Sequence, residues 1–220
     1  MTDTPFDRFA VEYDRWFDLH PYAYESELAA VRDLIPSKGL GVEVGAGTGR
    51  FSSPSSITIG VEPSESMAAI ACSRGITVHR ARAEDLPFQS EHFDFVLMVT
   101  TLCFVDDPIA ALKEVYRVLK PAGSFILAFI DKTTQLGRVY EAMKSTDRFY
   151  RSATFYSTQQ VIDLSHKGGF IESEIKQTIF SDPDSMTTPD PVREGFGEGA
   201  FVVIHSVKIP RKPNEHSYSD

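Results

Sequence analysis

Short runs of consecutive apolar residues alternate along this chain with segments in which apolar residues recur every three or four positions. The apolar runs predict buried strands at residues 40–45, 57–62, 76–80, 93–99 and 123–130. Helical spacing marks residues 21–35, 64–74 and 107–119. Strands that are apolar throughout and alternate with helices indicate a parallel sheet covered on both faces.

The pattern changes after residue 131. Helical spacing continues at 134–149 and 157–167, but two strand-like runs then follow, at 171–180 and 200–209, with a polar loop between them. Two strands joined by a loop can pair antiparallel. We therefore predict an α/β, Rossmann-like, seven-stranded and mostly parallel sheet, with an antiparallel C-terminal strand pair and helices on both faces.

The first connection between strands is unusually short. Residues 52–56 alone separate Phe51 from the second predicted strand. A crossover between parallel strands usually needs about a dozen residues or more, most of them helical. The sequence therefore predicts that the first crossover is a stub of one or two helical turns.

Composition narrows the classes of partner. The 220-residue chain has a formal net charge of −9, which argues against nucleic acid as the main partner because phosphate binding needs a basic face. No apolar run is long enough to span a bilayer, so we expect no stable membrane insertion. The N-terminus lacks a signal-peptide pattern, and we expect a cytoplasmic protein. Two cysteines are too few for a disulfide framework or a structural zinc site, and we expect no metal.

A glycine motif follows the first predicted strand. Gly45, Gly47 and Gly49 stand at alternate positions after Glu43. The dinucleotide fingerprint requires a glycine at position 50, where this chain has Arg50. The motif instead resembles the first motif of the class I S-adenosylmethionine-dependent methyltransferases, in a small single-domain branch similar to the enzymes of ubiquinone and menaquinone biosynthesis.

Later motifs follow in the register of that family. The second strand ends at Glu62 and Pro63, where family members hold the ribose hydroxyls with an acid, although NAD-binding proteins use an acid in the same way. The resemblance implies that Met67 packs on the adenine, and ordinary core packing is the open alternative. Residues 81–88 resemble the segment that reads the adenine edge. Arg82 replaces its usual aspartate, which leaves Glu84, Asp85 or a backbone amide to read the base.

Two further segments support the resemblance. Residues 93–107 match the fourth strand and its following loop, but Cys103 and Phe104 stand where many members carry a histidine pair. Cys103 could replace the missing base or could be a partly buried apolar residue, and both interpretations stay open. Residues 114–127 are similar to the helix-to-strand turn of the family, in which we expect Gly123 at the tight position.

The resemblance implies S-adenosylmethionine as cofactor, S-adenosylhomocysteine as product and in-line methyl transfer to a small-molecule acceptor. The expected cofactor contacts are Glu43, Gly45, Gly47, Gly49, Glu62, Pro63, Met67, Ala83, Glu84, Asp85, Val99 and Thr100. The candidate acceptor contacts are Tyr13, Trp16, His20, Tyr22, Thr101, Cys103 and Asp131. The N-terminal aromatic residues could form a lid over the acceptor or could only pack the first helix onto the sheet.

The expected organisation is an N-terminal helical lid segment at 1–36, the S-adenosylmethionine-binding methyltransferase domain at 37–209 and a flexible tail at 210–220. Two alternative functions remain open. A protein that binds the cofactor without transferring methyl groups would share every motif, and an NAD-linked oxidoreductase would share the early elements. The oligomeric state and the identity of the acceptor are left open.

Overall fold

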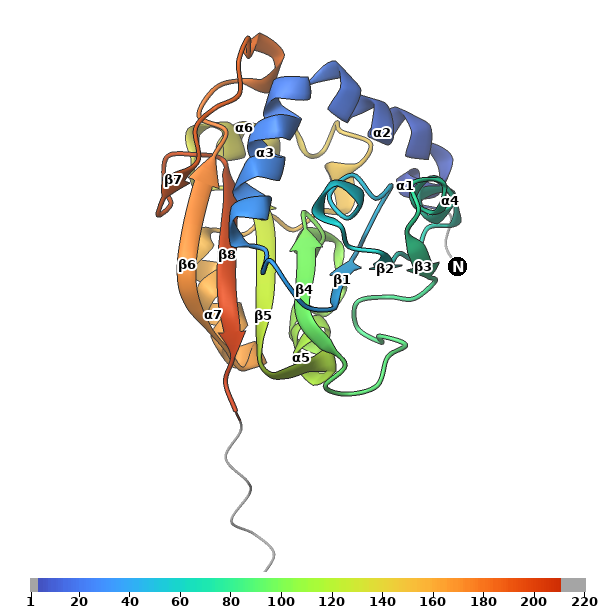
Figure 1. Cartoon of the computed structure of the whole chain (residues 1–220). Coiled ribbons are helices and arrows are strands. Elements are labelled where there is room, and N and C mark those ends of the chain that lie inside the picture. The colour runs from blue at the N-terminus through green and yellow to red at the C-terminus, as the bar shows by residue number, and fades with distance from the viewer. Residues whose placement is uncertain (1–3, 211–220) are drawn as a thin grey trace, which may run out of the picture.

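The fold is built on one eight-stranded sheet. The structure is a computed structural model that describes residues 4–210. The strand order is β3-β2-β1-β4-β5-β8-β6-β7 (Figure 1). The strands are β1 (Gly41–Val44), β2 (Ile59–Val61), β3 (Thr77–His79), β4 (Phe93–Val99), β5 (Leu119–Ile130), β6 (Phe170–Thr178), β7 (Arg193–Glu194) and β8 (Phe201–Lys208). The first five are parallel, and β8 is inserted antiparallel between β5 and β6, which confirms the predicted fold class.

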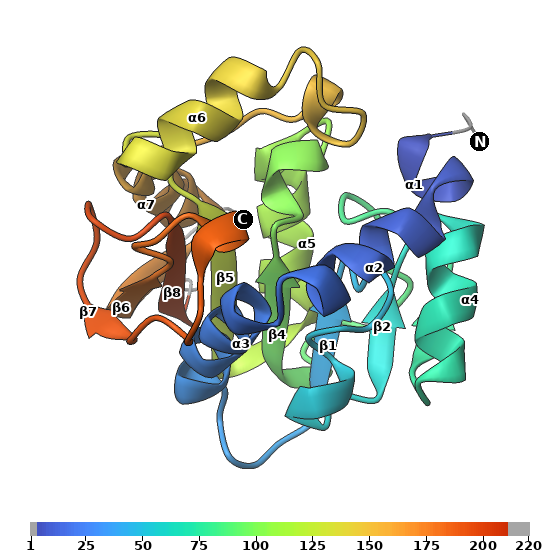
Figure 2. The same ribbon diagram turned by 90° about the horizontal axis from the view of Figure 1, so that it is seen from above.

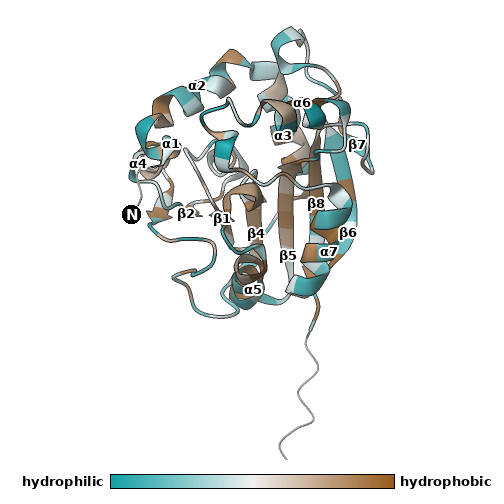
Figure 3. Ribbon diagram, turned by 180° about the vertical axis from the view of Figure 1, so that it is seen from behind, coloured by the Kyte–Doolittle hydropathy of each residue, from teal (hydrophilic) through white to brown (hydrophobic). Residues whose placement is uncertain are grey.

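Helices cover both faces of the sheet and its upper edge. The helices are α1 (Pro5–Arg8), α2 (Ala10–Leu19), α3 (Pro21–Leu34), α4 (Glu65–Ser73), α5 (Pro108–Val118), α6 (Gln135–Met143) and α7 (Thr158–Gly168). Short 3-10 turns are η1 (Ser53–Ser55), η2 (Leu102–Phe104), η3 (Tyr150–Ser152) and η4 (Pro183–Ser185). Helix α3 lies on one face and α5 and α7 lie on the other, as Figure 3 shows from behind. Helix α2 crosses above the carboxyl ends of β1 and β4, and α1 lies beside α4 (Figure 2).

The core has two layers because successive strand residues point to opposite faces. In β4, Val96 and Met98 pack with buried residues of α5 and α7. The alternating residues Leu97 and Val99 pack instead with α3 and with Phe17 of α2. The apolar run at 93–99 is continuous because both of these faces are buried.

Some elements differ from the prediction in number or extent. An eighth strand, β7, forms because Glu194 lies opposite Lys176 of β6 and its carboxylate pairs with the lysine ammonium at 2.7 Å. Helix α6 ends at Met143, six residues early, because the backbone amide of Thr146 turns back onto the Met143 carbonyl. The first crossover is the predicted stub, with η1 as its 3-10 turn. Apart from Pro210, the expected tail lies outside the described residues.

The turn before the buried part of β5 also differs in detail. The left-handed residue is Ala122, with φ of 59°, and not Gly123 as expected. Gly123 is required for another reason: a Cβ there would approach the Lys120 carbonyl oxygen to 2.9 Å and the Asp94 carbonyl oxygen to 3.1 Å. The turn therefore uses the glycine for close packing and places an alanine in the conformation that favours glycine.

Candidate cofactor and acceptor site

The glycine loop follows β1 at the point where the sheet reverses its order. Gly45, Gly47 and Gly49 all have positive φ, of 73°, 53° and 81°. A Cβ on Gly45 would approach Thr101 Oγ1 to 2.2 Å, and one on Gly49 would lie 3.3 Å from Ala71. A Cβ on Gly47 would meet nothing within 4 Å. Two glycines thus permit packing within the protein, and Gly47 borders open space that a ligand can approach.

Glu62 lies beside this loop, directly after β2. Its Oε2 accepts a hydrogen bond from the Gly47 amide at 2.9 Å, and its Oε1 accepts one from the Ser64 amide at 2.8 Å. Burial raises the pKa of the carboxyl group, and these two hydrogen bonds partly oppose that shift. Each carboxylate oxygen can accept a further hydrogen bond, so Glu62 can hold a ribose diol beside the partly exposed Gly47.

Glu43 has a different position from the one expected of a cofactor contact. Its side chain is buried within β1 and accepts a hydrogen bond from the Ser52 hydroxyl, which lies in the crossover stub. Burial raises the pKa of this carboxyl to about 8. Glu43 therefore holds the short crossover against β1, and any effect on a cofactor would pass through the loop that it anchors.

The segment expected along the adenine edge is fastened to the loop after β4. Glu84 Oε1 accepts hydrogen bonds from the backbone amides of Asp106 at 2.8 Å and Asp107 at 3.4 Å. Arg82 reaches Asp106 Oδ2 at 2.5 Å and also lies 3.5 Å from Glu84 Oε2. The Glu84 carboxylate is thus already hydrogen-bonded within the protein. The exposed Asp85 or a backbone amide is left as the group that could hydrogen-bond to the adenine.

The other expected cofactor contacts differ in burial. Met67 and Ala83 are buried, so their side chains occupy core positions. Pro63 is exposed, and its carbonyl oxygen accepts a hydrogen bond from a distant arginine. Val99 ends β4 in the core, and Thr100 follows it with φ of 47°. A non-glycine residue in the left-handed region is a strained conformation of the kind that clusters at functional sites.

Tyr13, a sequence-predicted acceptor residue on α2, interacts with the Thr100 side chain. A hydrogen bond with the Thr100 side chain lowers the pKa of the Tyr13 phenol. The charges of Glu27, Cys103 and Glu62 raise this pKa. Burial is the largest cause and raises the pKa of Tyr13 far above its ordinary value. The phenol is therefore uncharged at neutral pH and sits at the carboxyl end of β4.

Tyr13 belongs to a group of rings that we name the aromatic cluster. Its members are Phe6, Tyr13, Phe104, Phe149 and Tyr150. Ring centroids are 5.0 Å apart for Phe6 and Phe104, and 5.5 Å apart for Tyr13 and Phe149. The cluster joins the N-terminal helices to η2 and η3, so the helices that cross the sheet edge close over the loops that follow β4 and β5.

Trp16, His20 and Tyr22 do not line the cluster. The Trp16 and His20 rings stack with centroids 4.5 Å apart, and His20 Nε2 lies 2.8 Å from Asp184 Oδ1 in η4. Trp16 connects to Tyr13 through Phe17, which contacts both rings. Tyr22 is 38% exposed. Trp16 and His20 thus fasten α2 to the loop before β7, and Tyr22 lies at the surface of α3.

Thr101 and Cys103 stabilise the loop after β4. Thr101 Oγ1 donates a hydrogen bond to the Val99 carbonyl at 2.9 Å and packs against Gly45. Cys103 Sγ donates to the Thr100 carbonyl at 3.3 Å, and burial raises the pKa of the thiol to about 12. A thiol that stays protonated at neutral pH cannot serve as the missing general base, so the apolar interpretation of Cys103 describes it better.

Asp131 follows β5 and anchors the start of α7. Its two carboxylate oxygens accept four hydrogen bonds, from the amide and hydroxyl of Thr133 and the amide and hydroxyl of Thr158. Burial raises the pKa of this carboxyl, but the hydrogen bonds outweigh burial and lower it. Asp131 is therefore a structural acceptor that is already satisfied.

Sequence reasoning missed an ion cluster beneath α2. Asp14 accepts hydrogen bonds from both Arg50 and Arg74, at 2.7–2.9 Å. Arg74 Nη1 also donates to the Thr48 carbonyl in the glycine loop at 2.6 Å. The only signal in the sequence was an arginine where the dinucleotide fingerprint has glycine. It also missed Glu27, a buried carboxylate on α3.

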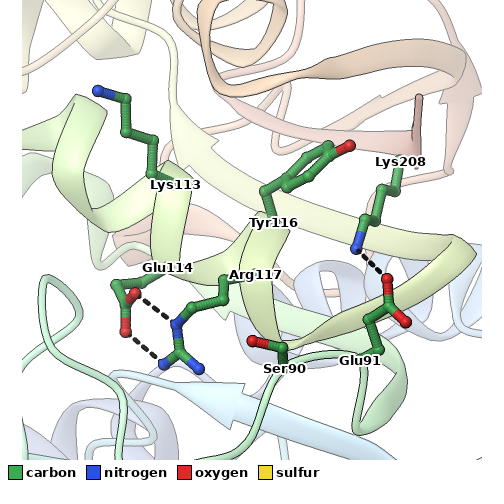
Figure 4. Close-up of a pocket in the computed structure, with 7 residues that line it drawn as sticks. All are labelled: Ser90, Glu91, Lys113, Glu114, Tyr116, Arg117 and Lys208. Atoms are coloured by element: carbon green, nitrogen blue, oxygen red, sulfur yellow. Dashed lines mark hydrogen bonds and ion pairs between the residues drawn. The ribbon is translucent and has the colours of Figure 1, made fainter. Parts of the chain in front are cut away.

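A hollow of about 520 Å³ lies at the opposite edge of the sheet. Figure 4 shows its lining residues, which are Ser90, Glu91, Lys113, Glu114, Tyr116, Arg117 and Lys208. Arg117 already pairs with Glu114 at 2.6 Å, and Lys208 Nζ donates to the Leu119 carbonyl at 2.6 Å. The hollow is therefore separate from the site at the glycine loop. Its Arg117 and Lys208 are already engaged in hydrogen bonds within the protein.

Residues 4–210 contain neither a bilayer-spanning helix nor a metal-binding cluster. No helix in this range has the length and apolar composition that crossing a bilayer requires. The same residues contain no group of three or more histidine, cysteine, aspartate or glutamate side chains placed to hold a metal ion.

Comparison with known proteins identifies the family. Residues 42–127 match the family model for a methyltransferase domain. A Thermotoga maritima protein named "SAM-dependent methyltransferase, possible histamine N-methyltransferase" is 54% identical, with 92% of this chain and 98% of that chain covered and a TM-score of 0.90. An uncharacterized protein of Methanocaldococcus jannaschii is 46% identical over 93% of this chain and 98% of its own length. The demethylmenaquinone methyltransferase of Symbiobacterium thermophilum is 29% identical, over 90% of this chain and 83% of its own length. The resemblance found in the sequence is confirmed: the chain belongs to the S-adenosylmethionine-dependent methyltransferases, and S-adenosylmethionine is its cofactor.

Proposed function

We propose that this protein transfers the methyl group of S-adenosylmethionine to a small-molecule acceptor by in-line displacement. The observation that carries the proposal is the position of Glu62. Its carboxylate binds the Gly47 amide beside open space, and its charge also acts on the Tyr13 phenol at the edge of the aromatic cluster. One short stretch of the sheet edge can therefore serve the cofactor and the acceptor together.

The cofactor would be held by backbone and carboxylate groups. Glu62 would accept hydrogen bonds from the ribose hydroxyls, and Gly47 would allow the loop backbone to approach the methionine part closely. Asp85 or a backbone amide near Ala83 would read the adenine. When bound, S-adenosylmethionine supplies a methyl group that is already activated by the positive charge on sulfur.

Positioning would supply most of the catalysis. Alignment of two reactants can contribute up to about 7–11 kcal/mol in ideal cases. Thr100, strained at the end of β4, and Tyr13 above it would border the path between the methyl donor and the acceptor. The aromatic cluster would exclude water from that path.

Residues 1–36 would act as the lid over the domain at 37–209. The described part of this segment supports the proposal, because α2 crosses the carboxyl ends of the strands, where open α/β sheets bind ligands (Figure 2). The aromatic cluster and the Asp14 ion cluster fasten the lid at two separate places. An acceptor would enter when the aromatic contacts open.

The names of the relatives bear on the type of acceptor. The Thermotoga maritima protein carries histamine in its name, and the Symbiobacterium thermophilum protein carries demethylmenaquinone. Both names refer to small molecules, which supports a small acceptor here without fixing its identity.

A product assay tests the proposal. Purified protein would be incubated with S-adenosylmethionine and a panel of small amines, phenols, quinols and carboxylates, and S-adenosylhomocysteine would be quantified by mass spectrometry. We expect acceptor-dependent product with one chemical class. Binding of the cofactor without product from any class would instead favour a protein that only binds S-adenosylmethionine.

A further inference from the structure

A buried carboxylate lies on the sheet-facing side of α3. Glu27 is 8% exposed, and it shares the inward face of the helix with Ala23, Ala30 and Val31, which are fully buried. Between residues 4 and 210, no hydrogen bond or ion pair reaches its side chain. An isolated carboxylate in such a place is costly to keep charged, and buried charges in proteins are normally paired.

The groups that face Glu27 come from three other elements. The phenols of Tyr13 in α2, Tyr140 in α6 and Tyr150 in η3 all lie near enough for its charge to act on them. Burial raises the pKa of each phenol far above its ordinary value, with the charge of Glu27 as a smaller cause, so all three are neutral at neutral pH. The charges of Asp182 and Asp184 also act on Tyr140. Glu27 therefore acts on three neutral phenols, one of which is also under the influence of two further carboxylates.

Such surroundings fit a positively charged ligand. Tyrosine rings attract cations through their faces, and a carboxylate adds a direct partner. Burial also raises the pKa of Glu27 to about 8, which is in the range where a carboxylate can exchange a proton at neutral pH. Tyr13 lies between Glu27 and the proposed cofactor site, because the charges of both Glu27 and Glu62 raise the pKa of its phenol.

We propose that Glu27 binds the ammonium group of an amine acceptor behind the aromatic cluster and takes up one of its protons before methyl transfer. This inference rests on the proposed function, because it specifies the acceptor of the same site. It makes Glu27 the residue that selects amines over uncharged acceptors of similar size.

The reaction balances without another reactant. The ammonium N–H bond breaks, its proton passes to Glu27, and the nitrogen keeps the electron pair. That pair forms the N–C bond to the methyl group as the C–S bond breaks, with its electrons going to sulfur. The products are a protonated methylamine, S-adenosylhomocysteine and a neutral Glu27, which returns its proton to solvent when the product leaves.

The test compares Glu27→Gln with Glu25→Gln, a matched change at an exposed glutamate of the same helix. The probes are histamine and phenethylamine as amines, and phenol and catechol as uncharged acceptors. Product formation is measured by S-adenosylhomocysteine release. Each amine is also titrated calorimetrically into the protein with S-adenosylhomocysteine bound. Repeating the titration in buffers of different ionisation enthalpy gives the number of protons exchanged when the amine binds.

We expect turnover and binding of an amine by the wild-type protein, and a loss of kcat/KM of about 100-fold or more in Glu27→Gln, the usual scale for a general base. Glu25→Gln should match the wild type, and both variants should bind S-adenosylhomocysteine with unchanged Kd. Glu27→Gln should also be the more stable protein at pH 8, which a purely structural loss would not produce.

Amine turnover within threefold of wild type in Glu27→Gln would overturn the inference, as would wild-type turnover of phenol or catechol but neither amine. Methyl transfer itself would survive either result. A wild-type protein that fails to bind S-adenosylhomocysteine would instead overturn the proposed function, and the inference with it.

Discussion

The carboxylate of Asp14 in α2 accepts two hydrogen bonds from the guanidinium of Arg50, at 2.9 Å from Nε to Oδ1 and 2.8 Å from Nη2 to Oδ2. Arg74 binds the same carboxylate from the end of α4. Burial raises the pKa of Asp14, but the two arginines outweigh it and hold the pKa well below its ordinary value. Arg50, which stands where the dinucleotide fingerprint has its third glycine, thus ties helix α2 to the cofactor loop.

Removing the charge of Asp14 should loosen this attachment. Asp14→Asn leaves two arginines without their shared partner, and we expect a loss of about 1.5–3 kcal/mol in the free energy of unfolding, the range for hydrogen bonds to charged groups. Urea unfolding measures that loss, and hydrogen exchange should show faster opening of residues 10–19. Asp18→Asn is the control, because Asp18 also pairs with Arg50 but its side chain is 64% exposed. Equal losses in the two variants would contradict the assignment.

Glu62→Gln should weaken cofactor binding. Glutamine keeps the shape of the side chain but loses the charge that would hold the ribose hydroxyls. A loss of about 1.5–3 kcal/mol corresponds to a Kd for S-adenosylhomocysteine that is about one to two orders of magnitude higher. Calorimetric titration gives the value, and Glu65→Gln, a change three residues away on an exposed side chain, controls for local charge. An unchanged Kd in Glu62→Gln would assign the ribose to another residue.

Stability should fall as pH rises between about 4.5 and 8 because of two buried glutamates. Burial raises the pKa of both Glu27 and Glu43 to about 8 in the folded protein. In this window the native state holds protons that the unfolded state has released. Each group therefore stabilises the fold below its unfolded pKa and loses that contribution as pH climbs toward 8, by up to about 1.4 kcal/mol per pH unit.

Denaturant unfolding from pH 5.5 to 8.5 measures this slope. Glu27→Gln and Glu43→Gln should each flatten it, because a neutral amide does not titrate. A variant with the wild-type slope would show that its glutamate titrates near the ordinary value when the protein is folded.

Ala122→Gly should stabilise the protein. Ala122 has φ of 59°, where glycine avoids the clash of a Cβ, although glycine costs more entropy on folding. We expect a net gain of about 0.5–1 kcal/mol in the free energy of unfolding. Ala142→Gly in α6 is the control and should lose about 1 kcal/mol, as glycine does inside a helix. A loss in both variants would mean that the turn does not strain Ala122.

Local periodicity was enough to predict most of the sheet. The apolar runs of β1, β4 and β5 are buried on both faces, so their sequences carry a strong strand signal, and the glycine loop follows β1 at a recognisable spacing. The predicted helix end that proved wrong is set by a single hydrogen bond. The end of α6 is set by the turn of Thr146 onto Met143, which no hydrophobic pattern encodes.

The site was less predictable because its side chains meet from distant parts of the chain. Asp14 and Arg50 are 36 residues apart, and nothing in either segment indicates the other. Glu27 left a usable signal: it is four residues from Ala23 and four from Val31, which places a charged residue on the buried face of α3. Residues singled out by their position after a strand, such as Asp131, proved to be hydrogen-bonded to neighbouring hydroxyl and amide groups.

A crystal structure of the protein with S-adenosylhomocysteine bound would test the central claim most directly. The account predicts the ribose hydroxyls within hydrogen-bonding distance of Glu62, the methionine part along the backbone of Gly47, and the sulfur directed toward Thr100 and Tyr13. A ligand bound elsewhere, or a sulfur directed away from the aromatic cluster, would contradict it.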